Sequence, residues 1–232
     1  MHEWKIFSCI SEASRAAADF IAEQIELAIS LRDVCYVLLP GGVTPVVCLR
    51  KLSEKNIPWE KVHWYLGDER CVAKSHASRN DLMLEINFWS RIPNANKYSI
   101  PAELGAEQGA AAYSEMIAPI KHFDIAFLGL GEDGHTASLF PDNAALNDTH
   151  PAVPVFNSPK PPGERVSVSV DTLKNARCRV ILTAGAAKAE VLSKIRSGEN
   201  LPVNTIGPVH WFVDSEAMSK TVNKPDTSST SK

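Results

Sequence analysis

The chain has 232 residues, of which 44% are hydrophobic and 22% are charged, and its formal net charge is −3. This composition is that of a globular protein with a buried core, and it excludes disordered and fibrous chains. The small negative charge gives no overall attraction to nucleic acid or to an anionic membrane, so neither is expected as a partner, although a local basic pocket can still bind a phosphate ester.

Apolar runs of strand length alternate with stretches of helical periodicity along the chain. We predict strands at residues 5–9, 34–39, 62–66, 123–128, 153–156, 165–169, 179–183 and 210–213. We predict helices at residues 12–30, with Ser11 as the N-cap, and at 45–55, 80–88, 105–117 and 187–197. This order predicts an α/β, Rossmann-like fold, in which a largely parallel sheet carries helices on both faces.

Two polar stretches lie outside this alternation. Residues 157–163 are rich in proline and lysine and are expected to form a loop. Residues 219–232 form a polar segment of low hydrophobicity, for which we predict disorder. Residues 1–218 are therefore expected to form a single domain.

The first segment that suggests chemistry is Pro-Gly-Gly-Val-Thr-Pro at residues 40–45, directly after a predicted strand. Gly41 and Gly42 allow a tight turn and let the backbone approach a ligand closely. The predicted helix that follows offers free N–H groups and the positive end of its dipole to an anion, so phosphate is the natural ligand. An ordinary strand-to-helix turn explains the glycine pair equally well.

The second segment is Gly-Asp-Glu-Arg at residues 67–70, after the strand predicted at 62–66. A run of charged residues is usually a solvated turn. Loops at the carboxyl ends of parallel strands, however, face the ligand crevice of an open sheet. At that position Arg70 is suited to form a bidentate pair with a phosphate or carboxylate.

The third segment, residues 129–141, begins Gly-Leu-Gly-Glu-Asp-Gly-His and contains a literal G-x-G-x-x-G pattern. A dinucleotide site requires a long helix opening at this loop and an acidic residue at the end of the next strand. Here Pro141 follows closely and Asp148 lies in a polar stretch, so we reject that interpretation.

The same loop presents one imidazole, His135, beside Asp133. Although an isolated histidine is more often structural, one on a glycine-rich loop has few core neighbours, and its charge changes near neutral pH, which favours a functional role. The chain contains no G-x-S-x-G motif, so covalent serine hydrolysis is poorly supported. A histidine base that activates water needs no nucleophilic side chain.

The cysteines and the N-terminal residues indicate the compartment. The five cysteines lie far apart without a Cys-x-x-Cys pair, and there is no histidine cluster at metal-ligand spacing, so we expect buried free thiols and no metal site. Acidic residues interrupt the apolar positions of residues 1–30, which argues against a signal peptide, and no later run reaches the length of a membrane span. A cytoplasmic location is expected.

Together the three segments resemble the 6-phosphogluconolactonase family, which shares its α/β fold with glucosamine-6-phosphate deaminases and ribose-5-phosphate isomerases. The similarity covers about residues 5–215 and is most specific in FDIAFLGLGEDGHTASLFP at 123–141. It extends to residues 39–45 and 64–72, to Arg165, and to the turn at 185–188. Two positions depart from the family pattern.

The first departure is Val43, which stands where the family commonly has a small hydroxyl residue, so one hydroxyl contact to phosphate is in doubt. The second is Arg79, which replaces a serine before Asn80. This leaves the role of Asn80 open, and Arg79 is a candidate for an additional positive charge.

The resemblance implies hydrolysis of 6-phosphoglucono-δ-lactone to 6-phosphogluconate in the oxidative pentose phosphate pathway, with no metal or organic cofactor. His135 is then the general base that activates water, and Asp133 orients the loop or the imidazole. The 6-phosphate lies on Gly41, Gly42 and Thr44. Arg70, Arg165 and Lys188 flank the phosphate, chiefly by resemblance.

Two other functions remain open. An aldose-ketose isomerase or deaminase acting on a sugar phosphate would use the same pocket with a carboxylate base such as Asp68. The deaminases typically have a tyrosine after the paired acids and an asparagine-glutamate continuation after the glycine-histidine pair, whereas this chain has Arg70 and Ala-Ser-Leu-Phe-Pro.

A non-catalytic sugar-phosphate sensor would usually need an output module, for which we expect no spare segment. The sequence does not distinguish a monomer from a dimer.

Overall fold

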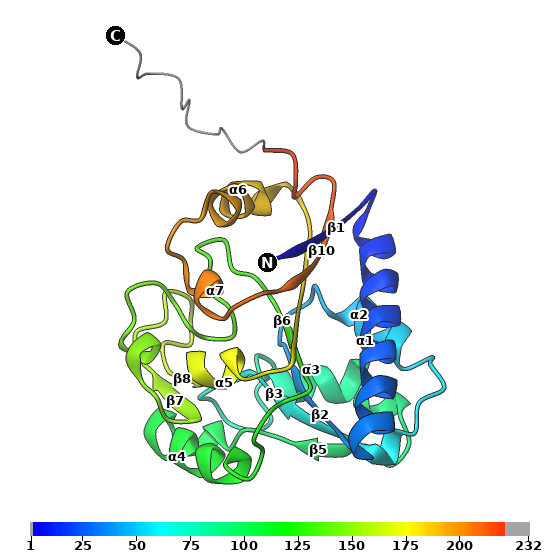
Figure 1. Ribbon diagram of the computed structural model, residues 1–232. Coiled ribbons are helices and arrows are strands. Elements are labelled where there is room, and N and C mark those ends of the chain that lie inside the picture. The colour runs from blue at the N-terminus through cyan, green and yellow to red at the C-terminus, as the bar shows by residue number, and fades with distance from the viewer. Residues whose placement is uncertain (1, 221–232) are drawn as a thin grey trace.

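The computed structural model describes residues 2–220, with a seven-stranded sheet at its centre (Figure 1). Each neighbouring pair of strands is parallel. In spatial order the strands are β1 (Glu3–Phe7), β10 (His210–Asp214), β9 (Cys178–Thr183), β6 (Ile125–Leu128), β2 (Cys35–Leu39), β3 (Val62–Leu66) and β5 (Asn96–Tyr98).

A second, three-stranded sheet is antiparallel and begins where β3 ends. It contains β4 (Asp68–Arg70), β8 (Arg165–Val168) and β7 (Ala152–Val155), in that order. Gly67 links the two sheets, because its N–H donates to the carbonyl of Leu39 at 2.9 Å and its carbonyl accepts from the N–H of Val168 at 2.8 Å. The carboxyl end of β3 is thereby fixed next to the start of β4.

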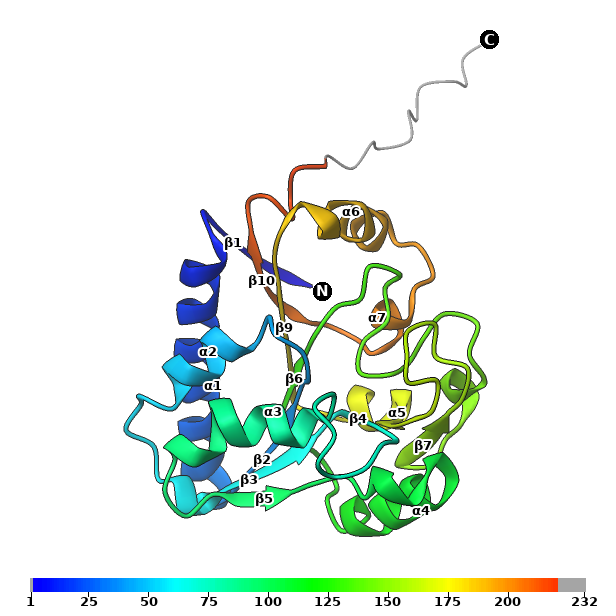
Figure 2. The same cartoon turned by 180° about the vertical axis from the view of Figure 1, so that it is seen from behind.

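Helices cover both faces of the parallel sheet. The α-helices are α1 (Ile10–Arg32), α2 (Val46–Leu52), α3 (Asn80–Asn87), α4 (Ala106–Ile117), α5 (Val170–Lys174), α6 (Ala189–Ser197) and α7 (Pro202–Thr205). The 3₁₀ turns are η1 (Trp59–Lys61), η2 (Trp89–Arg91), η3 (Ala102–Leu104), η4 (Ala144–Asn147) and η5 (Ala186–Lys188). Figures 1 and 2 show α1, α2 and α3 together on one side, with α4, α5 and the small sheet on the other.

Small apolar residues allow α1 to pack closely against the parallel sheet. Its buried positions recur every three or four residues, so they form one face of the helix, which contacts β9 and β10. The inward residues of this face are Ala13, Ala17, Ala18, Ile21, Ala22, Ile25 and Ala28. Burial of this face, more than local propensity, stabilises the helix.

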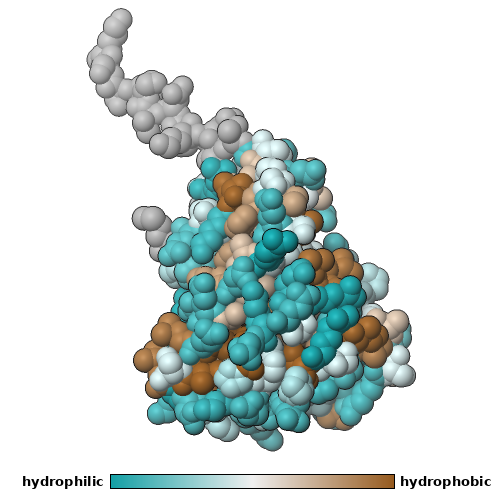
Figure 3. All heavy atoms as spheres, turned by 90° about the vertical axis from the view of Figure 1, so that its right-hand side faces the viewer, coloured by the Kyte–Doolittle hydropathy of each residue, from teal (hydrophilic) through white to brown (hydrophobic). Residues whose placement is uncertain are grey.

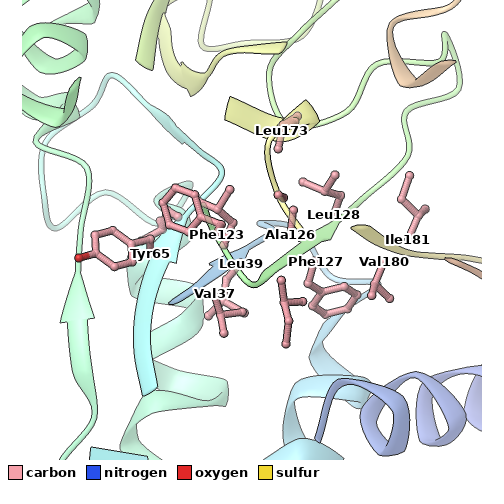
Figure 4. Close-up of a cluster of buried hydrophobic side chains, with 14 of the residues drawn as sticks. Val37, Leu39, Tyr65, Phe123, Ala126, Phe127, Leu128, Leu173, Val180 and Ile181 are labelled. Atoms are coloured by element: carbon pink, nitrogen blue, oxygen red, sulfur yellow. The ribbon is translucent and has the colours of Figure 1, made fainter. Parts of the chain in front are cut away.

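The central strands are buried on both sides. All four residues of β6 are buried, as expected for a parallel strand between two helical layers. Figure 4 shows Leu128 projecting toward Leu173 of α5, whereas Phe127 projects from the opposite face. The surface view in Figure 3 shows mostly hydrophilic residues with separated hydrophobic patches on the face drawn. The apolar interior therefore fixes the sheet on which the loops stand.

The predicted α/β fold with a largely parallel sheet is confirmed, and every predicted strand and helix lies within a few residues of an observed one. Two expectations are wrong. Ser11 is not the N-cap of α1, because the helix begins after Cys9, and the carboxylate of Glu12 instead accepts from Ser8 Oγ at 2.7 Å. Residues 68–70 are not a loop, because they pair with β8 as strand β4.

Several short elements were not predicted, namely β4, β5, α5, α7 and the 3₁₀ turns. Loop 157–163 is confirmed. Of the tail expected at 219–232, residues 221–232 lie outside the described residues. The single domain over residues 1–218 stays a prediction.

All five cysteines are free, as expected, but the expectation that they are buried holds only for Cys35, Cys48 and Cys178, because Cys9 is exposed and Cys71 is partly exposed. In residues 2–220 no helix combines the length and the apolar character that a membrane span requires.

Candidate active site

A cavity of about 200 Å³ opens at the carboxyl ends of β9, β6, β2 and β3, which are neighbours in the parallel sheet. The chain runs outward from β2 to β3 in one direction and from β6 to β9 in the other, so the cavity lies at the switch point where open α/β sheets bind ligands. All the predicted site residues except Asp133 line it: Gly41, Gly42, Thr44, Asp68, Arg70, His135, Arg165 and Lys188.

His135 and Asp133 form a pair in the loop that follows β6. Asp133 Oδ1 lies 2.5 Å from His135 Nδ1 and also accepts from the backbone N–H of His135 at 3.2 Å. Burial acts to raise the pKa of Asp133, but the hydrogen bonds and charge of His135 outweigh it and lower that pKa to about 2. Asp133 therefore remains ionised at neutral pH and holds the imidazole from its Nδ1 side.

Gly131 is required for this pair because its backbone passes directly beneath the imidazole. A Cβ at Gly131 would lie 2.0 Å from His135 Nδ1 and 2.6 Å from Asp133 Oδ1. Only glycine allows such a close approach. The ring of His135 also packs on Phe140, with the ring centroids 4.4 Å apart.

We expect Gly131→Ala to displace the ring of His135, the general base predicted from the sequence, and to lower kcat by at least about tenfold, because a catalytic base must keep its geometry to within a fraction of an ångström. Gly163→Ala is the matched control, since nothing lies within 4 Å of a Cβ at Gly163, which is not part of the cavity lining. Lactone hydrolysis by the two variants checks this. Equal rates for Gly131→Ala and Gly163→Ala would show that the loop accommodates a methyl group at Gly131 without moving the imidazole.

Asp68 and Arg70 reach the cavity because β4 places alternate residues on one side. Asp68 is buried, with 6% of its surface exposed, and its Oδ2 accepts from Ser138 Oγ at 2.5 Å. In the antiparallel register Arg70 pairs with Arg165. Burial lowers the pKa of Arg165 and so does the charge of Arg70, while the charge of Asp68 raises it. Two guanidinium groups and a carboxylate thus meet at one wall.

The three cationic side chains, Arg70, Arg165 and Lys188, differ in the hydrogen bonds that they already make within the protein. Arg165 Nη2 donates to the carbonyl of Lys160 at 2.8 Å, so this side chain also holds loop 157–163. Arg70 Nη1 donates to the carbonyl of Ser78 at 2.5 Å, whereas its buried Nε has no partner within residues 2–220. Lys188 Nζ donates to the carbonyl of Leu130 at 2.8 Å, and burial lowers the pKa of this lysine. Their concentration in one cavity creates a positive site on a chain of net negative charge.

The glycine loop lines the same cavity as these cations. Gly42 has φ of 84°, a conformation that favours glycine. The N–H groups of Gly41, Gly42 and Thr44 donate to no backbone carbonyl of the described residues. Helix α2 after the loop is shorter than predicted, Val46–Leu52 instead of residues 45–55.

Two polar side chains of the cavity, Asn80 and Thr183, were not among the predicted site residues, and a role for Glu69 was not predicted either. Thr183 ends β9, and its buried hydroxyl has no hydrogen-bond partner in the described part of the chain. The signal that could have identified Thr183 in the sequence is its position as a hydroxyl residue at the end of the strand predicted at 179–183. The role suggested for Arg79 is wrong, because its side chain is fully buried against acidic residues and does not line the cavity.

A family described as glucosamine-6-phosphate isomerases/6-phosphogluconolactonase matches residues 10–217. A protein named 6-phosphogluconolactonase from Mycobacterium leprae is 30% identical over 93% of this chain and 97% of its own length. A protein of the same name from a Synechocystis species is 33% identical over 85% of this chain and 89% of its own length.

The crystal structure of a 6-phosphogluconolactonase from Thermotoga maritima has a TM-score of 0.86 to this chain at 26% identity, and the match covers 93% of this chain and 100% of the other. The agreement in fold therefore covers most of this chain. The chain belongs to the glucosamine-6-phosphate isomerase/6-phosphogluconolactonase family.

Proposed function

We propose that the protein hydrolyses 6-phosphoglucono-δ-lactone to 6-phosphogluconate, a step of the oxidative pentose phosphate pathway. The relatives named 6-phosphogluconolactonase support this activity. The observation that carries the proposal is the His135–Asp133 pair on the wall of a cavity that also contains a glycine loop and three cations. The cavity therefore combines a candidate base with groups suited to a phosphate.

The base is His135. Ionised Asp133 accepts the hydrogen on Nδ1, which leaves the lone pair on Nε2 of the neutral imidazole. A water molecule gives its proton to Nε2 while its oxygen attacks the lactone carbonyl. The tetrahedral intermediate then collapses, the ring C–O bond breaks, and the proton passes to the released ring oxygen. General-base assistance of this kind contributes about 10²- to 10⁴-fold.

The phosphate site is formed by the backbone of Gly41 and Gly42, by Thr44, and by the side chains of Arg70, Arg165 and Lys188. Backbone N–H groups at a glycine turn and guanidinium groups are both suited to phosphate oxygens. Binding energy from this remote group positions the reacting carbonyl.

The direct test is hydrolysis of 6-phosphoglucono-δ-lactone, followed by proton release with the spontaneous rate subtracted. We expect the wild-type protein to accelerate ring opening far above that rate. A rate equal to the spontaneous one at saturating lactone would refute the proposed function. Formation of a ketose phosphate or of ammonia from an amino sugar phosphate would favour the isomerase or deaminase instead.

Asp68→Asn separates these two classes of reaction. A lactonase moves no carbon-bound proton, so we expect this variant to lose less lactonase activity than His135→Ala does. Asp68 is already hydrogen-bonded by Ser138, and Asn80 lies beside it, which suits a structural carboxylate better than a free base. Both variants are assayed on the lactone and on a ketose phosphate. Loss of ketose-phosphate turnover in Asp68→Asn alone would identify an isomerase.

A further inference from the structure

Asn80 is the first residue of α3, and its side chain lies in the cavity between two of the loops described above. It is buried, with 2% of its surface exposed. Its Nδ2 donates to the backbone carbonyl of Asp68 at 2.8 Å and lies 3.4 Å from Asp68 Oδ1. One amide therefore holds both the backbone and the carboxylate of Asp68.

The other side of the same amide touches the glycine loop. A Cβ at Gly41 would lie 1.9 Å from Asn80 Oδ1, 2.2 Å from its Cγ and 2.5 Å from its Nδ2. All three nearest atoms belong to Asn80, so this side chain packs directly against the backbone of the loop after β2 and limits how closely that loop approaches the strand after β3. The absence of a side chain at Gly41 is required by this contact.

A buried carboxylate fixes the backbone of Asn80. Glu69 is fully buried, and its Oε1 accepts from the N–H of Asn80 at 2.8 Å and from the N–H of Arg70 at 2.7 Å. Its Oε2 accepts from the N–H of Asp81 at 2.9 Å. Glu69 thus satisfies two free N–H groups at the start of α3, the task of an N-cap side chain, and fixes Arg70 at the same time.

We propose that Asn80 is a positioning residue that sets the distance between the Gly41–Gly42 loop and strand β4, and so determines how strongly the enzyme favours a phosphorylated substrate. The proposal rests on the proposed function. The contacts of Asn80 connect a loop offered to the phosphate with the strand that carries Arg70. Loss of the amide frees the two walls to move apart, so that the backbone donors and the guanidinium no longer converge on one phosphate.

The test compares Asn80→Ala with Asn87→Ala. Asn87 is the last residue of the same helix, is outside the cavity, and bonds to Arg50 and Met83. We expect Asn80→Ala to lower kcat/KM on the phosphorylated lactone by about tenfold or more, and on glucono-δ-lactone by about threefold at most, as for one lost hydrogen-bonded contact and its consequences. The readout is the ratio of kcat/KM on the phosphorylated lactone to kcat/KM on glucono-δ-lactone. A general loss of folded protein lowers both values equally and leaves this ratio unchanged.

A second variant pair examines the contact itself. Gly41→Ala is expected to lower kcat/KM on the phosphorylated lactone by at least about tenfold, because its methyl group overlaps Asn80. In the Asn80→Ala background the same substitution is expected to cost about twofold or less, because the overlapping atoms are gone. Additive losses in the double variant would overturn the proposal.

Inorganic phosphate separates this proposal from the proposed function, because its binding is measured by calorimetry without turnover. We expect phosphate affinity to fall by about fivefold or more in Asn80→Ala and to stay within about twofold in Asn87→Ala. A wild-type protein that binds phosphate but does not hydrolyse the lactone refutes the function alone. If the wild type is active but Asn80→Ala leaves the substrate ratio and the phosphate affinity unchanged, the positioning role alone is refuted. If the wild type neither binds phosphate nor hydrolyses the lactone, the proposed function and the positioning role are both refuted.

Discussion

Replacing His135 by alanine is expected to lower kcat for lactone hydrolysis by at least about 100-fold, because the variant lacks the base that takes a proton from water. The residue lies on a loop outside the helices and strands, so we expect the variant to fold, with only a small loss of melting temperature from the missing contact with Phe140. The measurement is initial rate at saturating lactone with the spontaneous rate subtracted, together with a thermal melt.

A second Asp-x-His pair in the chain provides the control. His150 Nδ1 lies 2.7 Å from Asp148 Oδ1, and the backbone N–H of His150 donates to the same oxygen at 3.0 Å, which repeats the local geometry of His135. The His150 side chain is 77% exposed and lies away from the cavity. We expect His150→Ala to keep wild-type kcat. A His135→Ala variant that retains more than about a tenth of the wild-type rate would reduce His135 to a positioning role.

The second large effect concerns the phosphate. Lys188→Ala is expected to lower kcat/KM on 6-phosphoglucono-δ-lactone by about 1.5 to 3 kcal/mol, the usual contribution of a charge-assisted hydrogen bond. Most of this loss should appear as a higher KM, because the phosphate stays bound throughout the reaction. The rate on glucono-δ-lactone should barely change, since the contact is absent with that substrate. Steady-state kinetics on both lactones measure the difference.

Lys194→Ala is the matched control for Lys188→Ala. Lys194 lies on the neighbouring helix α6, where its Nζ pairs with Glu190 at 3.3 Å and the side chain is 45% exposed. Exposed ion pairs of this kind contribute little to stability, so we expect Lys194→Ala to have the same kcat/KM as the wild type on both lactones. Equal losses on both lactones in Lys188→Ala would show that the lysine supports the fold, because its Nζ also donates to the carbonyl of Leu130. The phosphate contact would then be withdrawn.

The parallel sheet and the loops that line the candidate site could be predicted from the sequence. The apolar runs at 34–39, 62–66, 123–128 and 179–183 are long enough to predict buried strands, and a buried parallel strand has a local signal because both of its faces are apolar. The glycine loop and the Asp133–His135 loop follow such strands directly. Since the carboxyl ends of parallel strands share one edge of the sheet, the sequence was sufficient to bring these loops together.

The residues that lie between these loops, in β4 and at the start of α3, could be placed only from the folded chain. Strand β4 has three residues and no apolar alternation, so its pairing with β8 depends on a partner remote in the sequence. Arg79 was a candidate for an additional positive charge, yet its guanidinium is buried and paired with the carboxylates of Glu69, Asp81 and Glu103. Asn80 likewise has no sequence signal for its contact with Gly41. Local patterns record which residues are apolar and where the chain turns, whereas the burial of a charge or an amide depends on partners that only the folded chain brings within hydrogen-bonding distance.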